Sequence, residues 1–228
     1  MNKLPLISCI CITSNRSRLL VKAISYFNYQ NYPNRELVIS FPKKDLLSSQ
    51  VIYKFIEQNV NILPIEREED ESLGNSRNTA IIKCNGDYVC MWDDDDWHHR
   101  NRLLLQFNFL SKTSQRYQAS ILSQILLYDK LTEHSYASFL HTWEGTILCR
   151  KEILLQNQYA NRNRGEDSHV ISFLEKKNQL CHINDAAYLY IYIYHGKNTW
   201  DYNHFTYFTV KSYLLDKTSS KFIKDLVS

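Results

Sequence analysis

Short, almost continuous apolar runs alternate along the first part of the chain with longer segments whose apolar positions recur at helical spacing. The runs cover residues 6–12, 36–41, 60–65 and 88–92, which is the pattern of strands buried on both faces of a parallel sheet. The segments between them indicate helices from about Ser17, from Leu46 after a capping Asp45, and from Leu73 after a capping Ser72. The alternation predicts an α/β sheet with right-handed crossovers.

The pattern continues less regularly toward the C-terminus. We expect helices over residues 100–110 and around 170–174, strands near 120–128, 147–149 and 187–194, and closing helices over 203–215 and 221–227. A chain of 228 residues suits one compact domain, 1–228, with a large core.

Composition excludes several classes of protein. The net charge of +3 is small and unsegregated, so no nucleic-acid partner is expected. Six cysteines at irregular spacing include no C-x-x-C, and we interpret them as reduced core residues. The sequence shows no signal-peptide pattern and no apolar run of transmembrane length. We therefore expect a cytoplasmic protein, and leave open a peripheral contact with the inner face of the membrane.

The stretch DYVCMWDDDDWHH, residues 87–99, places four carboxylates at the end of the fourth predicted strand. If strand alternation continues, Asp93 and Asp95 point one way while Asp94 and Asp96 point the other. Two carboxylates held that close repel by about 3 kcal/mol at an effective dielectric near 20, which favours a bound divalent cation. The structural alternative is a turn, or Asp96 capping a following helix.

Ligands of such sheets sit beyond the carboxyl ends of the strands. There the loop 13–16 ends the first strand and residues 93–96 end the fourth, so an anionic group on the first loop can share a cation with the second. A nucleotide diphosphate fits this arrangement. No G-x-x-x-x-G-K-[ST] and no G-x-G-x-x-G occurs, so a metal rather than a glycine cradle must compensate the phosphates.

Four segments carry a family resemblance: LISCICITSNRSRLLVKAISYFNYQNYPNRELVIS, LGNSRNTAIIKCNGDYVCMWDDDDWHHRNRL, GTILCRKEIL and GEDSHVISFL. Together they resemble the successive motifs of glycosyltransferase family 2, inverting enzymes of the GT-A fold, over nearly the whole chain. The resemblance implies a single Rossmann-like domain with a mixed, mostly parallel central sheet flanked by helices. Residues 1–110 would form the nucleotide- and metal-binding half, and 111–228 the acceptor-side half with the C-terminal helices.

The resemblance also implies roles for individual residues. The nucleotide would contact Thr13, Asn15, Arg16, Arg77 and Asp94, and Mn²⁺ or Mg²⁺ would bind Asp93 and Asp95. Relatives often carry a metal-binding histidine after the strand that here ends at residue 194. We choose His195 over His204 for it, and imidazole favours Mn²⁺. On position alone, Arg77 is also compatible with a surface ion pair to the acidic run 66–71, which otherwise reads as a solvated loop.

The acceptor side follows from the later motifs. In relatives the second residue of the E-D pair is the catalytic base, which here is Asp167, and Trp143, Glu144 and Glu166 belong to the donor-sugar or acceptor side. Position alone leaves two structural alternatives: Asp167 as a helix N-cap and Trp143 as a core residue.

One departure concerns the nucleobase. Relatives carry Asp-Asp-Gly-Ser after the second strand, where this chain has residues 40–45, SFPKKD, so the expected carboxylate is missing or displaced to Asp45. Lys43 and Lys44 fit an ordinary charged turn. A UDP-sugar is still the expected donor, although uridine specificity is left open.

These observations predict an inverting, metal-dependent glycosyltransferase that transfers sugar to a glycan or another hydroxyl acceptor in bacterial surface glycan synthesis. Two alternatives stay open: a sugar-phosphate nucleotidyltransferase, which normally needs a glycine-rich loop that residues 13–18 do not supply, and a non-catalytic carbohydrate-binding module.

Overall fold

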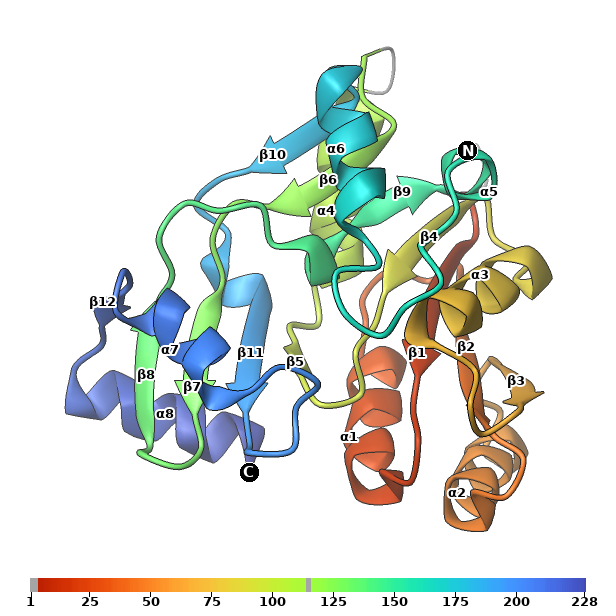
Figure 1. Ribbon diagram of the computed structural model, residues 1–228, viewed down its shortest axis with the longest axis horizontal. Coiled ribbons are helices and arrows are strands. Elements are labelled where there is room, and N and C mark those ends of the chain that lie inside the picture. Colours follow the sequence, from red (N-terminus) through yellow and green to blue (C-terminus); the bar gives the residue numbers. More distant parts are fainter. Residues whose placement is uncertain (1–3, 114–115) are drawn as a thin grey trace.

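The computed structural model describes residues 4–113 and 116–228 (Figure 1). The predicted alternation of strand and helix is present in the first part of the chain. Its elements are β1 (Ile7–Ile12), α1 (Ser17–Asn28), β2 (Arg35–Pro42), α2 (Leu46–Glu57), β3 (Ile62–Arg67), α3 (Leu73–Lys83) and β4 (Tyr88–Met91). Two predicted caps are confirmed, because Asp45 accepts from the Ser48 amide and Ser72 accepts from the Asn75 amide.

These strands belong to a seven-stranded sheet in the order β10-β6-β9-β4-β1-β2-β3. It gains β6 (Ala119–Leu122), β9 (Leu148–Arg150) and β10 (Leu180–Ile183) from later in the chain. β9 runs antiparallel to both its neighbours, whereas the remaining pairs are parallel. The prediction of a mixed, mostly parallel central sheet is confirmed.

Helices cover both faces of this sheet. Side chains of α1, α2 and α4 (Arg102–Lys112) pack on one face around Phe27 and Leu37. Side chains of α3, α5 (Lys151–Gln156) and α6 (Ser168–Lys176) pack on the other around Val38 and Val89. At the start of α2, Leu46 and Leu47 are 68% and 65% exposed, and burial begins at Ser48.

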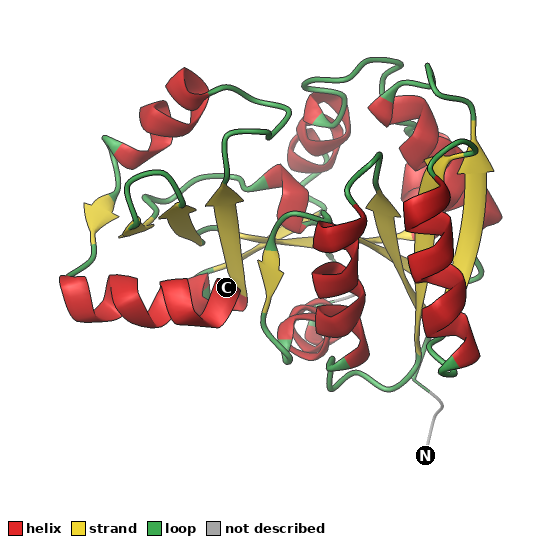
Figure 2. Ribbon diagram, turned by 90° about the horizontal axis from the view of Figure 1, so that it is seen from below, coloured by secondary structure: helices red, strands yellow, loops and turns green. Residues whose placement is uncertain are grey.

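A second sheet of five strands was not predicted. It lies beside the first (Figure 1), in the order β12 (Tyr213–Leu214), β8 (His134–Ala137), β7 (Leu126–Asp129), β11 (Tyr190–Tyr194) and β5 (Trp97–His98). Figure 2 shows α7 (Tyr202–Thr209) and α8 (Lys217–Val227) on opposite sides of it.

Three predicted elements are wrong in extent. The single strand near 120–128 is two strands in different sheets: after β6, the Ser123 amide still donates to the Ile183 carbonyl, and the Ile125 amide then turns to Ser138 Oγ. The closing helix over 203–215 ends at Thr209, and β12 follows it. The strand expected over 187–194 begins at Tyr190, after a 3₁₀ turn, η2 (Ala187–Leu189).

The cysteines are free, as expected; five are buried and Cys181 is half-buried. Within the described residues, no helix is both long and apolar enough to cross a membrane.

The strand order reverses at β1, because β2 lies on one side of it and β4 on the other. In open α/β sheets this is where a crevice forms at the carboxyl ends of the strands. The residues that follow β1 and β4 here are Thr13 and the four aspartates, so the topology itself brings them together.

Candidate active site

Three of the four aspartates after β4 bind the first loop or the second sheet. Asp94 accepts from Thr13 Oγ1 (2.5 Å) and from Arg16 Nη1 (3.1 Å). Asp95 accepts from the same Arg16 nitrogen at 3.0 Å. Asp96 is buried, and it accepts from the Tyr190 hydroxyl and the Ile193 amide of β11. The loop is thus bound to the first loop and to the second sheet.

The expected alternation of the aspartates is wrong, because β4 ends at Met91 and Asp94 and Asp95 lie in a turn where both face Arg16. The alternative in which Asp96 caps a helix is also wrong, since the next element is the strand β5 and Asp96 bonds to β11.

The first loop is shaped by Asn15 and Asp45. Asn15 has a positive φ of 54°, a conformation that asparagine tolerates better than most residues. Its amide donates to Asp45 Oδ2 at 2.6 Å, while the other oxygen of Asp45 caps α2. The displaced carboxylate that we considered for the nucleobase is therefore occupied with the backbone of this loop.

Arg77 of α3 faces three carboxylates that come from two chain segments. It is buried, and it binds Glu166, lies 3.3 Å from Asp93 Oδ1 and lies 3.8 Å from Asp167 Oδ2. The alternative of a surface ion pair with the acidic run is wrong. Sequence spacing could not show this, because Glu166 and Asp167 are 89 and 90 positions beyond Arg77.

The 3₁₀ turn η1 (Glu144–Thr146) brings Gly145 close to Asp93 and Glu144 close to Asp167 and Glu166. A Cβ on Gly145 would lie 3.1 Å from Asp93 Oδ2, so a side chain at this position would require the Asp93 carboxylate to shift by a few tenths of an ångström. Burial and the carboxylates of Asp167 and Glu166 raise the pKa of Glu144 to about 8. At neutral pH this side chain is mostly protonated.

The site holds more negative than positive charge. Seven carboxylates, those of residues 93–96, 144, 166 and 167, face the guanidinium groups of Arg16, Arg77 and Arg102. Burial, followed by Asp95, raises the pKa of Asp94 to about 7. Burial also raises the pKa of Asp93, against the opposing effect of Arg77. A cation would relieve this excess.

The two candidate histidines are placed differently. His195 Nε2 lies 3.2 Å from Asp95 Oδ2, and the neighbouring Lys197 carbonyl accepts from Arg16. His204 stacks on Trp200 with ring centroids 4.1 Å apart. Of these two histidines, His195 is the one that lies beside the aspartate loop. Trp143 packs against His141 and Phe208 and is half-buried. This placement does not decide between a core residue and a residue on the sugar or acceptor side.

Asp167 occupies the N-cap position of α6, but its side chain makes no capping hydrogen bond with any described residue. The carboxylate is 17% exposed, whereas that of Glu166 is 5% exposed and bound to Arg77. The capping alternative therefore does not account for Asp167.

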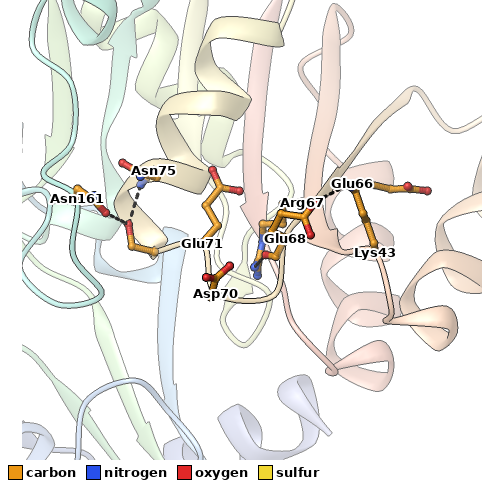
Figure 3. A pocket seen from close by; sticks show the side chains of 9 residues that line it. Lys43, Glu66, Arg67, Glu68, Asp70, Glu71, Asn75 and Asn161 are labelled. Carbon is orange, nitrogen blue, oxygen red and sulfur yellow. Dashed lines mark hydrogen bonds and ion pairs between the residues drawn. The ribbon is translucent and has the colours of Figure 1, made fainter.

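A polar pocket of about 540 Å³ opens beside the first loop, at the carboxyl ends of β2 and β3 (Figure 3). Its walls are Lys43, Glu66, Arg67, Glu68, Asp70, Glu71, Ser72, Asn75 and Asn161. Arg67 Nη2 donates to the Thr13 carbonyl at 3.0 Å, which joins the pocket to the site. The acidic run, expected to be a solvated loop, is therefore partly strand and partly pocket wall, while Lys43 pairs with Glu68 as a charged turn would.

Sequence reasoning missed His98, Arg102 and Tyr190. Their positions in the helix and strand patterns gave no functional signal, although an arginine that opens the apolar helix α4 at a fully buried position is unusual.

Comparison with known proteins gives consistent results. A sequence model described as Glycosyl transferase family 2 matches residues 8–172. Glycosyltransferase GlyA of Streptococcus pneumoniae is 30% identical over 115 residues, which are 50% of this chain and 16% of GlyA. An uncharacterized glycosyltransferase of Haemophilus influenzae is 27% identical over 107 residues, 47% of this chain and 43% of that protein. The chain thus spans less than half the length of these relatives.

Two solved structures share the fold. TarS of S. aureus, in complex with UDP-GlcNAc, has a TM-score of 0.65 and 17% identity, with 85% of this chain and 60% of that one covered. The mannosyltransferase PcManGT of Pyrobaculum calidifontis, in complex with GDP-Man and Mn²⁺, has a TM-score of 0.66 and 14% identity, with 85% and 57% covered.

Proposed function

Because the chain belongs to glycosyltransferase family 2, we propose that it is an inverting, metal-dependent enzyme that transfers a sugar from a nucleotide diphosphate to an acceptor hydroxyl. The observation that carries the proposal is the convergence of the aspartate loop, Arg16, Arg77 and Asp167 at the carboxyl ends of β1 and β4. Family membership favours this reaction over nucleotidyl transfer and over a non-catalytic carbohydrate-binding module. A role in bacterial surface glycan synthesis belongs to the same proposal.

The nucleotide would lie along the edge of the seven-stranded sheet. Thr13, Asn15, Arg16, Arg77 and Asp94 would bind it, and the pocket at β2 and β3 has room for the base. TarS and PcManGT were solved with UDP-GlcNAc and GDP-Man, which supports a nucleotide-sugar donor. We propose a UDP-sugar.

The residues present fit a divalent cation. Asp93 and Asp95 supply carboxylate oxygens, and His195 supplies an imidazole nitrogen beside Asp95, a donor set that suits Mn²⁺ and, without the histidine, Mg²⁺. In residues 4–113 and 116–228, no three His, Cys, Asp or Glu side chains are grouped to hold a metal alone. Such ions commonly use one or two carboxylates and complete their shell with substrate phosphates. The bound ion supplies Lewis-acid neutralisation of the leaving diphosphate.

Asp167 would act as the general base on the acceptor hydroxyl. It is the more exposed carboxylate of the pair, since Glu166 is buried and bound to Arg77. Attack by the acceptor oxygen on the anomeric carbon, as Asp167 takes its proton, is a single displacement that inverts the configuration. Trp143, Glu144 and Glu166 would line the sugar or acceptor side, with Glu144 protonated at neutral pH.

Thermal unfolding with UDP, GDP and ADP, each with Mn²⁺ or with EDTA, tests the proposal. A ligand at 100 times its Kd stabilises the native state by about 2.7 kcal/mol. For a chain of this size that corresponds to a rise in Tm of about 5–10 °C. We expect this rise with UDP and Mn²⁺ and a smaller one with EDTA. No rise with any nucleoside diphosphate would contradict the proposal.

A further inference from the structure

Arg102 is the first residue of α4 and is fully buried. Its guanidinium donates hydrogen bonds to four acceptors. Nε donates to Gln106 Oε1 at 3.1 Å, and Nη2 donates to the carbonyls of Met91 (3.0 Å) and Gly145 (3.4 Å). Nη1 donates to His98 Nδ1 at 2.6 Å. One guanidinium therefore binds the end of β4, the turn η1 and the strand β5, the three segments that surround the aspartate loop.

No carboxylate of the described residues pairs with Arg102 within ion-pair distance. The faces of the guanidinium instead meet the rings of Trp92 and Tyr190, with centroids 5.5 and 4.9 Å away. Burying an arginine without a direct carboxylate partner is costly. The charge nevertheless opposes the burial that raises the pKa of Asp93. Arg102 is thus a fixed positive charge beneath the acidic loop.

His98 connects this charge to the loop. An arginine has only donors, so His98 Nδ1 must be the acceptor, and the ring proton is on Nε2. That nitrogen donates to the carbonyl of Asp93 at 3.2 Å. The ring is stacked on Trp92, 3.8 Å between centroids, which fixes its orientation. The series Gln106, Arg102, His98 and Asp93 is a continuous set of buried hydrogen bonds that ends at a predicted metal ligand.

We propose that His98 and Arg102 are positioning residues that hold the Asp93 backbone so that the carboxylates of Asp93 and Asp95 are presented to the cation. The inference rests on the proposed function, because it presumes that these carboxylates bind the metal. Outer partners of this kind orient metal ligands, and their loss typically costs 10–100-fold in metal affinity. Gln106 connects Arg102 to η1, because it accepts from Arg102 Nε and its Nε2 donates to the Thr146 carbonyl at 2.8 Å.

Three substitutions at His98 separate the two hydrogen bonds. His98→Asn places an amide where Nδ1 lies, so it keeps an acceptor for Arg102 but cannot reach Asp93. His98→Gln extends one bond further and can restore the donor to Asp93. His98→Phe keeps the ring stack on Trp92 and loses both bonds. The Kd of Mn²⁺ at saturating UDP, measured from the EPR signal of free Mn²⁺, should rise 10–100-fold in His98→Asn and His98→Phe and much less in His98→Gln.

A matched control separates positioning from general destabilisation. Glu36 is buried near the start of β2, at the end of the seven-stranded sheet opposite the aspartate loop. It accepts from Ser8 Oγ (2.6 Å) and from Asn85 (2.6 and 2.8 Å). Glu36→Gln should lower the urea midpoint and leave the Mn²⁺ Kd unchanged. If His98→Phe does not fold, His98→Asn alone decides the question.

Wild-type Mn²⁺ affinity in His98→Asn would overturn the inference. So would an equal loss of affinity in Glu36→Gln, because metal binding would then follow stability alone. Failure of the unaltered chain to bind UDP with Mn²⁺ would contradict the proposed function itself, and the inference with it.

Discussion

Replacing Arg77 by methionine removes the guanidinium that faces Asp93, Glu166 and Asp167 together. The guanidinium is 7% exposed, and its partners come from the aspartate loop and the start of α6. Methionine keeps most of the volume, so the substitution tests charge and hydrogen bonding more than packing. Three carboxylates then face one another without the compensation that Arg77 supplies.

The size of the effect follows from the burial. Removing one partner of a buried ion pair costs about 3–5 kcal/mol, and each kcal/mol shifts the Tm of a chain this long by about 2–4 °C. We therefore expect Arg77→Met to lower the free energy of unfolding by about 3–5 kcal/mol at pH 8. Burial already raises the pKa of Asp93 and Glu166, and Arg77 opposes that rise. Without Arg77 these pKa values rise further, the native state holds protons more tightly than the unfolded state, and stability falls as pH increases. The loss should be smaller at pH 5.

Urea unfolding of the unaltered chain and of Arg77→Met, at pH 5 and at pH 8, measures the loss of unfolding free energy and its dependence on pH. Arg150→Met is a suitable control, because Arg150 packs on the Tyr88 ring at 5.2 Å, away from the acidic site. A loss below about 1 kcal/mol at pH 8, or an equal loss at the two pH values, would refute the reasoning.

Three further predictions use the same site. Asp95→Asn should abolish the Mn²⁺-dependent part of the UDP thermal shift and leave the fold intact or slightly more stable, since it relieves repulsion with Asp94; an unchanged Mn²⁺ dependence would argue against the metal role. Arg16→Gln should weaken UDP binding about tenfold or more by calorimetry, the value of one charge-assisted hydrogen bond, and an unchanged Kd would remove Arg16 from the nucleotide site. Glu144→Gln should raise Tm above pH 8, where the raised pKa makes ionisation of Glu144 destabilising, and change little at pH 5; the opposite order would show that its carboxylate is stabilising.

The strands and helices up to β4 could be predicted because each is encoded locally. Continuous apolar runs, helical periodicity and the caps Asp45 and Ser72 are all within a dozen residues of the elements they define. The reversal of strand order at β1 then follows from topology, which is why Thr13 and the aspartates could be placed at one edge of the sheet.

The second sheet could not be predicted, because its strands are short and pair across long sequence separations. β5 has two residues and pairs with β11, almost a hundred positions later along the chain, so neither shows a strand pattern that identifies its partner. The orientation of the aspartates failed for a related reason. Their directions are set by Arg16, Tyr190 and Ile193, not by the strand that precedes them.

For Arg77 and Asp167, the family resemblance predicted roles that the local sequence left open. Local sequence left a surface ion pair and a helix cap as alternatives, and both are excluded only by the three-dimensional contacts around Arg77. Arg102 and His98 were out of reach by either route, because their significance depends on which backbone carbonyls they meet.

The central claim is that Asp167 is the general base, which takes the proton of the acceptor hydroxyl during sugar transfer. Asp167→Asn tests this claim most directly. In a reaction that contains Mn²⁺, a UDP-sugar and an acceptor hydroxyl, UDP release coupled to sugar transfer should fall by about two to four orders of magnitude, while the UDP Kd stays near the wild-type value. Asparagine caps a helix about as well as aspartate, so a structural role predicts normal turnover. Wild-type turnover by Asp167→Asn would contradict the account, and Glu166 would then be the next residue to replace.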